Sequence, residues 1–542
     1  MRILLVASLF TLTSIAAIQQ RPPATARISG EAIDALTDRP LPSVLVHIGE
    51  LEVMTNPQGQ FTVENIPQGK HALVATADGY MVGRLGKEKA ASNGITLSLK
   101  SGDEIVGLKI YLAPAGAISG QLLDGNGQAV SNAEVIALPY NYDYAGNLVL
   151  AGSKNPGSGF NLLITLLAPA GIHPLPDVSR IHKTIRTDDR GQYRIYNLDP
   201  GAYGIVTRAP SSNDAIYYPG VSVPGDAERV VVESGHETRL RPLLLKQTSG
   251  AALLIRIDDR PGGRSSFRGV ILRHKGGMDV LQMPLSGVRA LSGIKLLPGR
   301  YEAEGITGNA GPPLSLAAAK IDFEIRDTDR EIVIPAPRGV ALRGTVAAEI
   351  AGATRPLPNV SIVVGSSEVM PSFTANLTSD ASGTFSAASF PTGLFHVFSI
   401  QGIPEGACVR DFRQNDRNVL LDGLDVSDPP VRFQVNVGEP MSVVRGYLRD
   451  TAGAPIQGGN VVLVPEDSRR KDLFATTVSD WKGGFELMCL HPGSYRIFSW
   501  LELNGAPYFN PDFMKAFEGA GRKIQLEQNS AVEVDGLSPL EN

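Results

Sequence analysis

The sequence predicts an all-β protein made of about five small antiparallel β-sandwich domains in tandem. Three observations lead to this prediction: a hairpin motif that recurs along the chain, short stretches in which polar and apolar residues alternate, and a length of 542 residues. A single hydrophobic core stops growing at roughly 250–300 residues, so a chain of this length should divide into several domains. The 58 glycines and 38 prolines, without a collagen-like period, are typical of short strands joined by tight turns.

The N-terminus has the pattern of an export signal. Arg2 supplies a positive charge, residues 3–15 form a mainly apolar segment, and the small residues Ser14 and Ala16 suit cleavage after Ala16 or Ala17. We therefore expect residues 1–17 to be a signal peptide and the product to be exported to the periplasm, the cell surface or the medium. The alternative is a membrane anchor, but a stretch of about 15 apolar residues is shorter than the roughly 20 that a spanning helix needs. We expect no membrane span after cleavage.

One hairpin motif recurs four times with the same internal spacing. An Asn or Asp is followed by Gly three residues later, by an aromatic residue two further on, and by a second Gly ten residues after the first. The short polar side chain closes an Asx turn, and the Gly supplies the positive φ of the hairpin. The strand that follows alternates between apolar and polar residues, as expected for a strand with one buried face. The motif begins at Asn56, Asp188, Asp380 and Asp480, and its rings are Phe61, Tyr193, Phe385 and Phe485.

A strand with a central glycine opens each copy of the motif. Because strand residues alternate between two faces, the glycine falls on the apolar face, where the missing side chain lets a backbone or a large ring approach closely. These glycines are Gly30, Gly120, Gly344 and Gly446.

The same landmarks predict the domain order. A divergent copy fills the middle of the chain and keeps an aromatic turn at Tyr301 but lacks the Asx–Gly turn. One helix is expected, from Pro511 to Glu518. The expected β-sandwiches cover residues 24–113, 114–246, 247–337, 338–438 and 439–542, and the second carries a long insertion at 138–183.

These features resemble a known family. The glycine-centred strand, the Asx-x-x-Gly-x-aromatic hairpin and the Pro-Gly-x-Tyr turn resemble the carboxypeptidase regulatory-like domain, a transthyretin-like or Ig-like β-sandwich appended to metallocarboxypeptidases and outer-membrane receptors. The stretches at Tyr217–Gly220 and from Val419 through Gly536 resemble exported multi-repeat proteins abundant in acidobacteria. The resemblance implies a carbohydrate-binding-like fold, and by analogy it implies glycan binding.

The resemblance does not extend to the catalytic half of a metallocarboxypeptidase. None of the eight histidines lies in an HExxH or HxH arrangement. His47 and Glu50 have the HxxE spacing, but they fall inside the regulatory-like module. We therefore predict no catalytic residues, no metal site and no cofactor. The net charge of −5, without a stripe of Lys and Arg, argues against a nucleic-acid partner.

The insertion at 138–183 holds the candidate ligand-binding residues. Tyr140, Tyr142 and Tyr144 fall on one side of an extended strand, where a row of rings stacks sugars or contacts protein. The alternative is an edge strand with ordinary surface tyrosines. The apolar run Phe160–Leu167 either packs on its own domain or forms an interaction surface. Trp500 belongs to a second aromatic group with Tyr508 and Phe509, and packing in the core or against a helix is the interpretation we favour for it.

The two cysteines, Cys408 and Cys489, are candidates for a disulfide in an oxidising compartment. The alternative is two separately buried thiols, and the sequence leaves both open.

Two functions are compatible with the sequence. The first is an exported, non-catalytic protein of the cell envelope, with a structural or binding role and with polysaccharide or envelope proteins as partners. The second is an enzyme, such as a glycosidase, with an active site in the insertion, where Asp143, Asp177 and His182 share one segment.

Overall fold

The computed structural model describes most of the chain after the expected signal peptide. The described residues are 25–540 except for 87–93, 143–145, 147, 151–182, 209–214, 222–223, 246–250, 259–266, 276–279, 285–289, 297, 310–313, 327, 336–337, 351, 366–373, 428, 440 and 504. The expected signal peptide, the apolar run Phe160–Leu167 and Tyr144 lie outside them, as do Asp143, Asp177 and His182.

The all-β fold is confirmed. The strands form pairs of sheets around separate hydrophobic cores, which we number domains 1 to 5 in chain order. The residue boundaries between the domains stay a prediction. In domain 1 one sheet contains β1 (Ala26–Asp34), β4 (Gln60–Ile66) and β8 (Glu104–Leu112), and the other contains β2 (Leu45–Ile48), β3 (Leu51–Met54), β5 (Gly69–Thr76), β6 (Gly83–Arg84) and β7 (Thr96–Leu99).

Domains 2 and 3 repeat this arrangement. In domain 2 the sheets are β9 (Gly116–Asp124), β13 (Gln192–Leu198), β17 (Glu237–Arg239) and β18 (Leu243–Leu245), and β10 (Glu134–Tyr142), β11 (Leu148–Leu150), β12 (Lys183–Arg186), β14 (Gly201–Arg208), β15 (Ala215–Tyr217) and β16 (Val230–Val232). In domain 3 they are β19 (Ala251–Ile257), β22 (Ala290–Leu296) and β25 (Arg330–Ile334), and β20 (Phe267–His274), β21 (Val280–Pro284), β23 (Gly299–Asn309) and β24 (Leu314–Ile325).

Domain 2 holds the short 3₁₀-helix η1 (Pro224–Asp226), and domains 4 and 5 carry the other helices of the described residues. In domain 4 the sheets are β26 (Gly339–Ile350), β27 (Ala353–Pro356), β30 (Thr384–Pro391), β32 (Cys408–Gln414), β33 (Arg417–Asn418) and β35 (Val431–Gly438), and β28 (Ser361–Gly365), β29 (Thr374–Thr378), β31 (Leu394–Gln401) and β34 (Leu424–Asp425), with α2 at Val419–Asp422. In domain 5 they are β36 (Ser442–Leu448), β39 (Gly484–Leu490) and β42 (Ala531–Leu537), and β37 (Asn460–Pro465), β38 (Ala475–Val478), β40 (Gly493–Trp500) and β41 (Arg522–Leu526). Domain 5 also holds η2 (Lys471–Leu473), η3 (Pro507–Phe509) and α3 (Pro511–Lys515).

Among the described strands, pairing within a sandwich is antiparallel except where the first strand pairs in parallel with the end of its domain, with one strand in domains 1, 3, 4 and 5 and with both β17 and β18 in domain 2. In domain 1 this pair is β1 with β8. Because these two strands run the same way, the chain enters a domain at one end and leaves it at the other. Successive domains therefore follow one another end to end.

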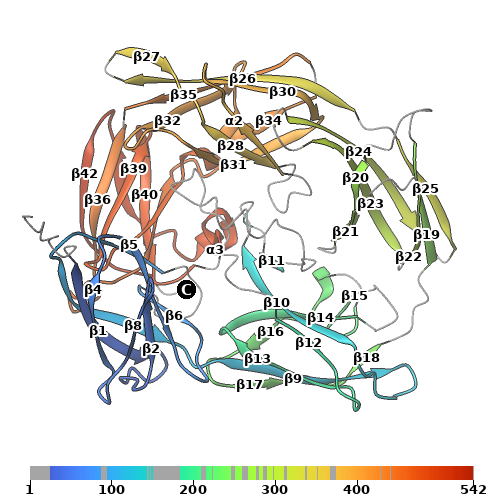
Figure 1. Ribbon diagram of the computed structural model, residues 1–542, viewed down its shortest axis with the longest axis horizontal. Helices are drawn as coiled ribbons and strands as arrows, with labels where there is room; N and C mark the ends of the chain where they lie inside the picture. Colours follow the sequence, from blue (N-terminus) through green and yellow to red (C-terminus); the bar gives the residue numbers. More distant parts are fainter. Residues whose placement is uncertain are drawn as a thin grey trace, which may run out of the picture.

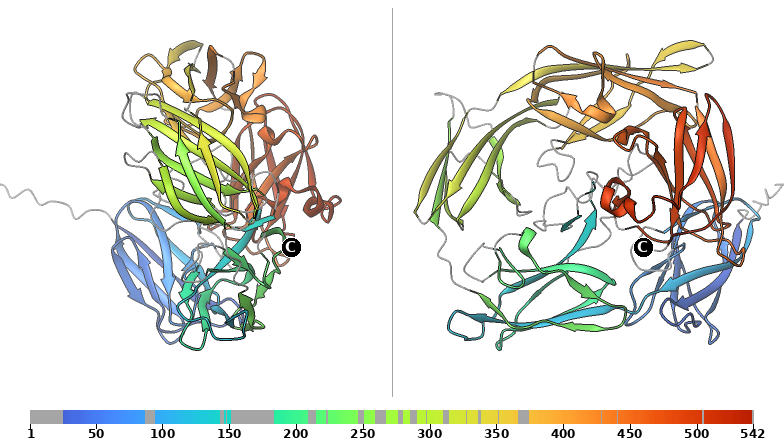
Figure 2. Two further views of the ribbon diagram at one scale, coloured as in Figure 1. Left: turned by 90° about the vertical axis from the view of Figure 1, so that its right-hand side faces the viewer. Right: turned by 180° about the vertical axis from the view of Figure 1, so that it is seen from behind.

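The five domains lie around a ring (Figure 1), and the view from behind shows the same order (Figure 2). At the first junction the amide of Ala115 donates to the carbonyl oxygen of Gly79, at 2.9 Å. Strand β24 of domain 3 pairs in parallel with β30 of domain 4 and joins their sheets. Domain 5 lies beside domain 1, where Gly458 approaches Gly86.

The four Asx hairpins have one geometry. In each hairpin the Asx side-chain oxygen accepts hydrogen bonds from the backbone amides two and four residues later, which is the bonding expected of an Asx turn. For Asp188 these bonds are 2.9 and 2.7 Å long. The same pairs of bonds are made by Asn56, Asp380 and Asp480. The rings that follow are buried, as predicted: Phe61 is 3% exposed, Tyr193 6%, Phe385 0% and Phe485 6%.

The glycine of each opening strand permits a close approach, as predicted. A Cβ atom on Gly30 would lie 2.1 Å from the carbonyl oxygen of Leu108, and one on Gly344 would lie 2.1 Å from the ring of Phe433. Neither neighbour is free to retreat, because one is backbone and the other is a buried ring. A side chain at these positions would therefore force the sheet apart.

A buried hydroxyl precedes each Asx residue and is a further shared feature of the four hairpins. The hydroxyl of Thr55 accepts a hydrogen bond from the amide of Val44 and donates one to the carbonyl oxygen of Leu41, both at 2.9 Å. It thereby ties the hairpin to the chain entering β2. The signal available in the sequence was a Thr or Ser at the same place in all four copies; Thr187, Ser379 and Ser479 make the equivalent bonds.

Candidate functional site

Domain 5 receives a contact from the insertion of domain 2, near the centre of the ring where β11 and α3 lie (Figure 1). The end of β10 forms a parallel bridge between Tyr142 and Gly505, and the amide of Ala506 donates to the carbonyl oxygen of Tyr142 at 3.2 Å. The side-chain amide of Asn510 donates to the carbonyl oxygen of Gly146 at 2.7 Å. We call these contacts the central joint.

Two glycines make the central joint possible. A Cβ atom on Gly146 would lie 2.5 Å from the carbonyl carbon of Phe509, and one on Gly505 would lie 2.1 Å from the carbonyl oxygen of Tyr142. Both glycines have positive φ, at 82° and 75°. Backbone therefore lies directly against backbone, and a larger residue at either position would separate the two domains.

The structure places Tyr140 and Tyr142 two residues apart on β10, so both lie on one side of the strand, as expected. Both rings are half-buried and have partners within the protein. The Arg229 guanidinium carbon lies 5.4 Å from the Tyr140 ring centroid, and the ring of Tyr142 lies 6.0 Å from that of Phe513. Burial raises the pKa of Tyr140, and the charge of Arg229 opposes this shift. Two of the three rings thus serve contacts inside the molecule, and ligand binding by the row stays a prediction.

The second aromatic group forms a compact cluster behind the central joint. The ring of Trp500 is fully buried, and it stacks on Phe498 with ring centroids 5.6 Å apart. Phe513 and Phe517 of the α3 region pack against Trp500 at 5.9 and 5.4 Å. Among the described residues, the indole nitrogen of Trp500 and the hydroxyl of Tyr508 have no hydrogen-bond partner. The cluster therefore supports the helix and the joint, in agreement with the core role favoured above.

The two cysteines form a disulfide between domains. Cys408 on β32 of domain 4 is bonded to Cys489 on β39 of domain 5, with their Cα atoms 5.5 Å apart. Cys489 has a φ of 62°, a left-handed conformation that suits Asn much better than Cys. Domains 1 and 2 have Asn65 and Asn197 at the equivalent position, both with positive φ. Domain 4 has Ser389 at this place, so the absence of Asn by itself did not announce the disulfide.

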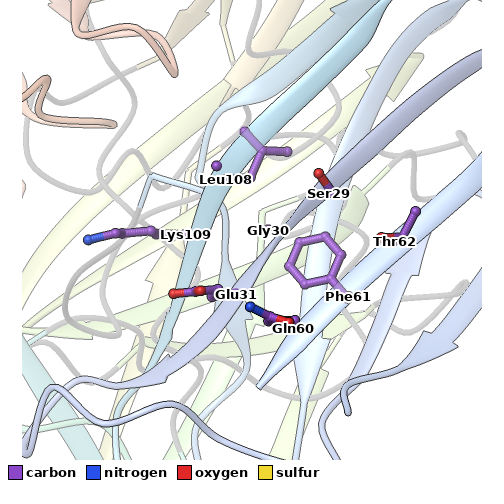
Figure 3. A pocket seen from close by; sticks show the side chains of 9 residues that line it. Ser29, Gly30, Glu31, Gln60, Phe61, Thr62, Leu108 and Lys109 are labelled. Carbon is purple, nitrogen blue, oxygen red and sulfur yellow. The ribbon is translucent and has the colours of Figure 1, made fainter. Parts of the chain in front are cut away.

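A polar hollow lies on the outer sheet of domain 1 (Figure 3). It has a volume of about 410 Å³ and lies where β1, β4 and β8 run side by side around Gly30. Its lining is Ser29, Gly30, Glu31, Gln60, Phe61, Thr62, Gly107, Leu108 and Lys109. Hydroxyl, amide, carboxylate and ammonium groups thus surround one notch, and the ring of Phe61 lies beneath it.

Short side chains flank the hollow on one side. Ser29 and Thr62 lie opposite one another on β1 and β4, and neither is long enough to cross the notch. In domain 2 an ion pair between Arg194 and Glu237, at 2.8 Å, lies beside Ser119, which corresponds to Ser29 at that side of the hollow. A hydrogen bond from Ser119 together with Arg194 lowers the pKa of Glu237, which keeps that pair charged.

The structure gives no support to the HxxE pair as a metal site. His47 lies opposite Glu52 in the β2–β3 pairing, and its Nδ1 atom is 3.1 Å from Glu52 Oε1. In the part of the chain that the structure describes, no three His, Cys, Asp or Glu residues are grouped as a metal ion would require. None of the helices in that part has the length and hydropathy of a membrane span.

Comparison with known proteins adds little beyond the fold. No protein-family model matches the chain, and no curated protein matches it by sequence. Among solved structures, the Bacillus anthracis TIE protein aligns over 78% of this chain and 74% of its own, with 10% identity and a TM-score of 0.14. GBS52, the minor pilin of Streptococcus agalactiae, aligns over 41% of this chain and 97% of its own (13%, TM-score 0.21), and the RrgB pilus protein of Streptococcus pneumoniae over 79% and 98% (8%, TM-score 0.16). Likenesses at these TM-scores carry no functional argument.

Proposed function

We propose that this protein is an exported, non-catalytic scaffold of the cell envelope, built from carboxypeptidase regulatory-like sandwiches, and that it binds polysaccharide or envelope proteins. The proposal rests on the hydrogen bonds that the recurring polar residues make in the structure. Each Asx oxygen accepts hydrogen bonds from backbone amides of its own domain. Each preceding hydroxyl accepts from one backbone amide and donates to one backbone carbonyl oxygen of the same domain. The repeated polar groups thus stabilise turns, which is what a scaffold requires.

Export is supported by the bond between Cys408 and Cys489. Disulfides persist in oxidising compartments and are rare in a reducing cytosol. This one joins two domains, so it would stabilise their arrangement outside the cell. The test is expression with and without residues 1–17, followed by cell fractionation and mass spectrometry of the thiols. We expect the full chain to be outside the cytoplasm and oxidised, and the shortened chain to be inside and reduced; a full chain that stays cytoplasmic would contradict the proposal.

For carbohydrate binding we propose the hollow of domain 1 as the site. A sugar presents many hydroxyls, and the hollow offers donors and acceptors of several kinds beside Gly30. The natural comparison is domain 2, where Arg194 stands at the position that corresponds to Thr62 and reaches Glu237 on a neighbouring strand. We expect Thr62→Arg to cover the hollow in the same way.

The experiment is retention of the mature chain on a panel of insoluble polysaccharides. Thr62→Arg should abolish retention, whereas Thr96→Arg, at an exposed position of β7 in the same domain, should leave it unchanged. Retention that survives Thr62→Arg would place the site elsewhere. If the wild-type chain is retained on no polymer, the carbohydrate part of the proposal fails, and the scaffold part is then judged by the export experiment.

A further inference from the structure

The hairpin of domain 5 differs from the other three at its tip. The residue after the Asx is Pro57, Asp189 or Ala381 in domains 1, 2 and 4, and Trp481 in domain 5. A tip of this kind normally faces water and needs no large apolar ring. Trp481 instead packs against the hydrophobic core cluster of domain 1, and the Lys482 ammonium lies 4.6 Å from the Trp481 ring centroid on the same hairpin.

The backbones of domains 1 and 5 meet beside the Trp481 side chain. A Cβ atom on Gly458 would lie 1.7 Å from the carbonyl oxygen of Gly86, so the two glycines are in direct contact. Gly458 belongs to the same end of domain 5 as Trp481, because its amide donates to the carbonyl oxygen of Ser479 at 2.9 Å. Gly86 follows the buried residue Leu85 of the domain 1 core.

We propose that Trp481 and Gly458 form a latch that docks the last domain on the first and closes the five-domain chain into a ring. The occupant of the domain 1 surface is thus the hairpin of the same chain. An aromatic anchor against an apolar core, with backbone contact beside it, is the usual composition of an energetically important interface. The disulfide to domain 4 and the central joint to domain 2 hold domain 5 near this position, which raises the effective concentration of the hairpin at domain 1.

The latch depends on none of the groups assigned above to ligand binding. It deepens the scaffold proposal by naming the contact that closes the ring, but it would hold equally for a protein with another function. Its failure would leave the export and polysaccharide experiments untouched.

Two variants test the latch by different means. Gly458→Ala inserts a methyl group into the contact with Gly86, and Trp481→Ala removes the anchor while keeping the turn residues Asp480 and Gly483. The matched control is Gly453→Ala: Gly453 also has a positive φ, of 85°, in domain 5, but a Cβ there meets nothing within 4 Å, whereas Gly458 has a φ of 70°. The control therefore carries the backbone strain of the substitution without the clash.

The measurements are small-angle scattering and hydrogen exchange on the full mature chain, with and without a reductant. We expect both variants to increase the radius of gyration, most clearly after reduction, and to raise exchange around Leu85 by roughly tenfold or more, as when an interface loses its anchor. Gly453→Ala should match the wild type in both. The latch would be overturned if scattering and exchange were the same in the wild type and in all three variants. It would also be overturned if the wild type had the mass of two chains and Trp481→Ala the mass of one, because the hairpin would then dock on a second copy.

Discussion

The hydroxyl of Thr55 gives the sharpest test of how the hairpins are held. Thr55→Val keeps the shape of the side chain but removes both hydrogen bonds, to the amide of Val44 and to the carbonyl oxygen of Leu41. A buried donor or acceptor left without a partner costs about 1–3 kcal/mol. The amide is buried and the carbonyl only partly so, which places the expected loss of unfolding free energy for domain 1 at about 2–4 kcal/mol.

Native-state hydrogen exchange is the suitable assay, because a chain of five domains does not unfold in one step. Since 1.4 kcal/mol corresponds to a factor of ten, amides in β2 and β5 should exchange roughly 25 to 700 times faster. Two controls distinguish loss of the buried hydroxyl from a general effect of replacing Thr by Val. Thr55→Ser keeps the hydroxyl, and Thr96→Val makes the same chemical change at an exposed position of domain 1. If Thr55→Val exchanges no faster than Thr96→Val, the assigned role of the hydroxyl is incorrect.

Three further predictions concern the joints and one hairpin. Asn510→Asp keeps an oxygen to cap α3 but loses the amide donor to Gly146, so chemical cross-linking between domains 2 and 5 should fall several-fold while circular dichroism is unchanged; equal cross-linking would contradict the central joint. Hydrogen bonds from the Ser382 side chain and nearby amides lower the pKa of Asp380 from 3.8. The carboxylate therefore stabilises its hairpin above pH 3.8, and this stabilisation is lost as the pH falls through the lowered pKa. In Asp380→Asn, exchange of the hairpin amides, corrected for intrinsic rates, should not depend on pH in this acid range, and an acid transition that persists would refute the assignment. Cys408→Ser combined with Cys489→Ser should destabilise domains 4 and 5 by about 2–5 kcal/mol and leave the β9 amides of domain 2 unchanged in hydrogen exchange, whereas an equal effect on all domains would argue against a local link.

The sequence alone was sufficient for the all-β fold class and for the four hairpins that recur in it, but not for the parallel pairing of the first strand with the end of its domain. The Asx hairpin closes within four residues, as at Asp188, so its geometry is determined by neighbours in the chain. The burial of the ring at Phe61 follows from the same local alternation, because side chains of a strand point to opposite faces. The two cysteines were recognised as candidates, but the pattern could not decide between a bond and two thiols.

Only the tertiary structure decided how the domains meet and what the exceptional residues do. Asn510 and Gly146 are 364 positions apart, and neither occupies a place in the repeat that would announce their hydrogen bond. Tyr142 was read as part of a surface row and instead lies against Phe513, while Trp481 occupies a turn position that favours no particular neighbour. The order of residues within one repeat determines its turns and strands, because those hydrogen bonds join near neighbours in the chain. Contacts between domains join residues far apart in the sequence, so they depend on how whole domains are placed, and one unusual residue in a repeat does not reveal its partner.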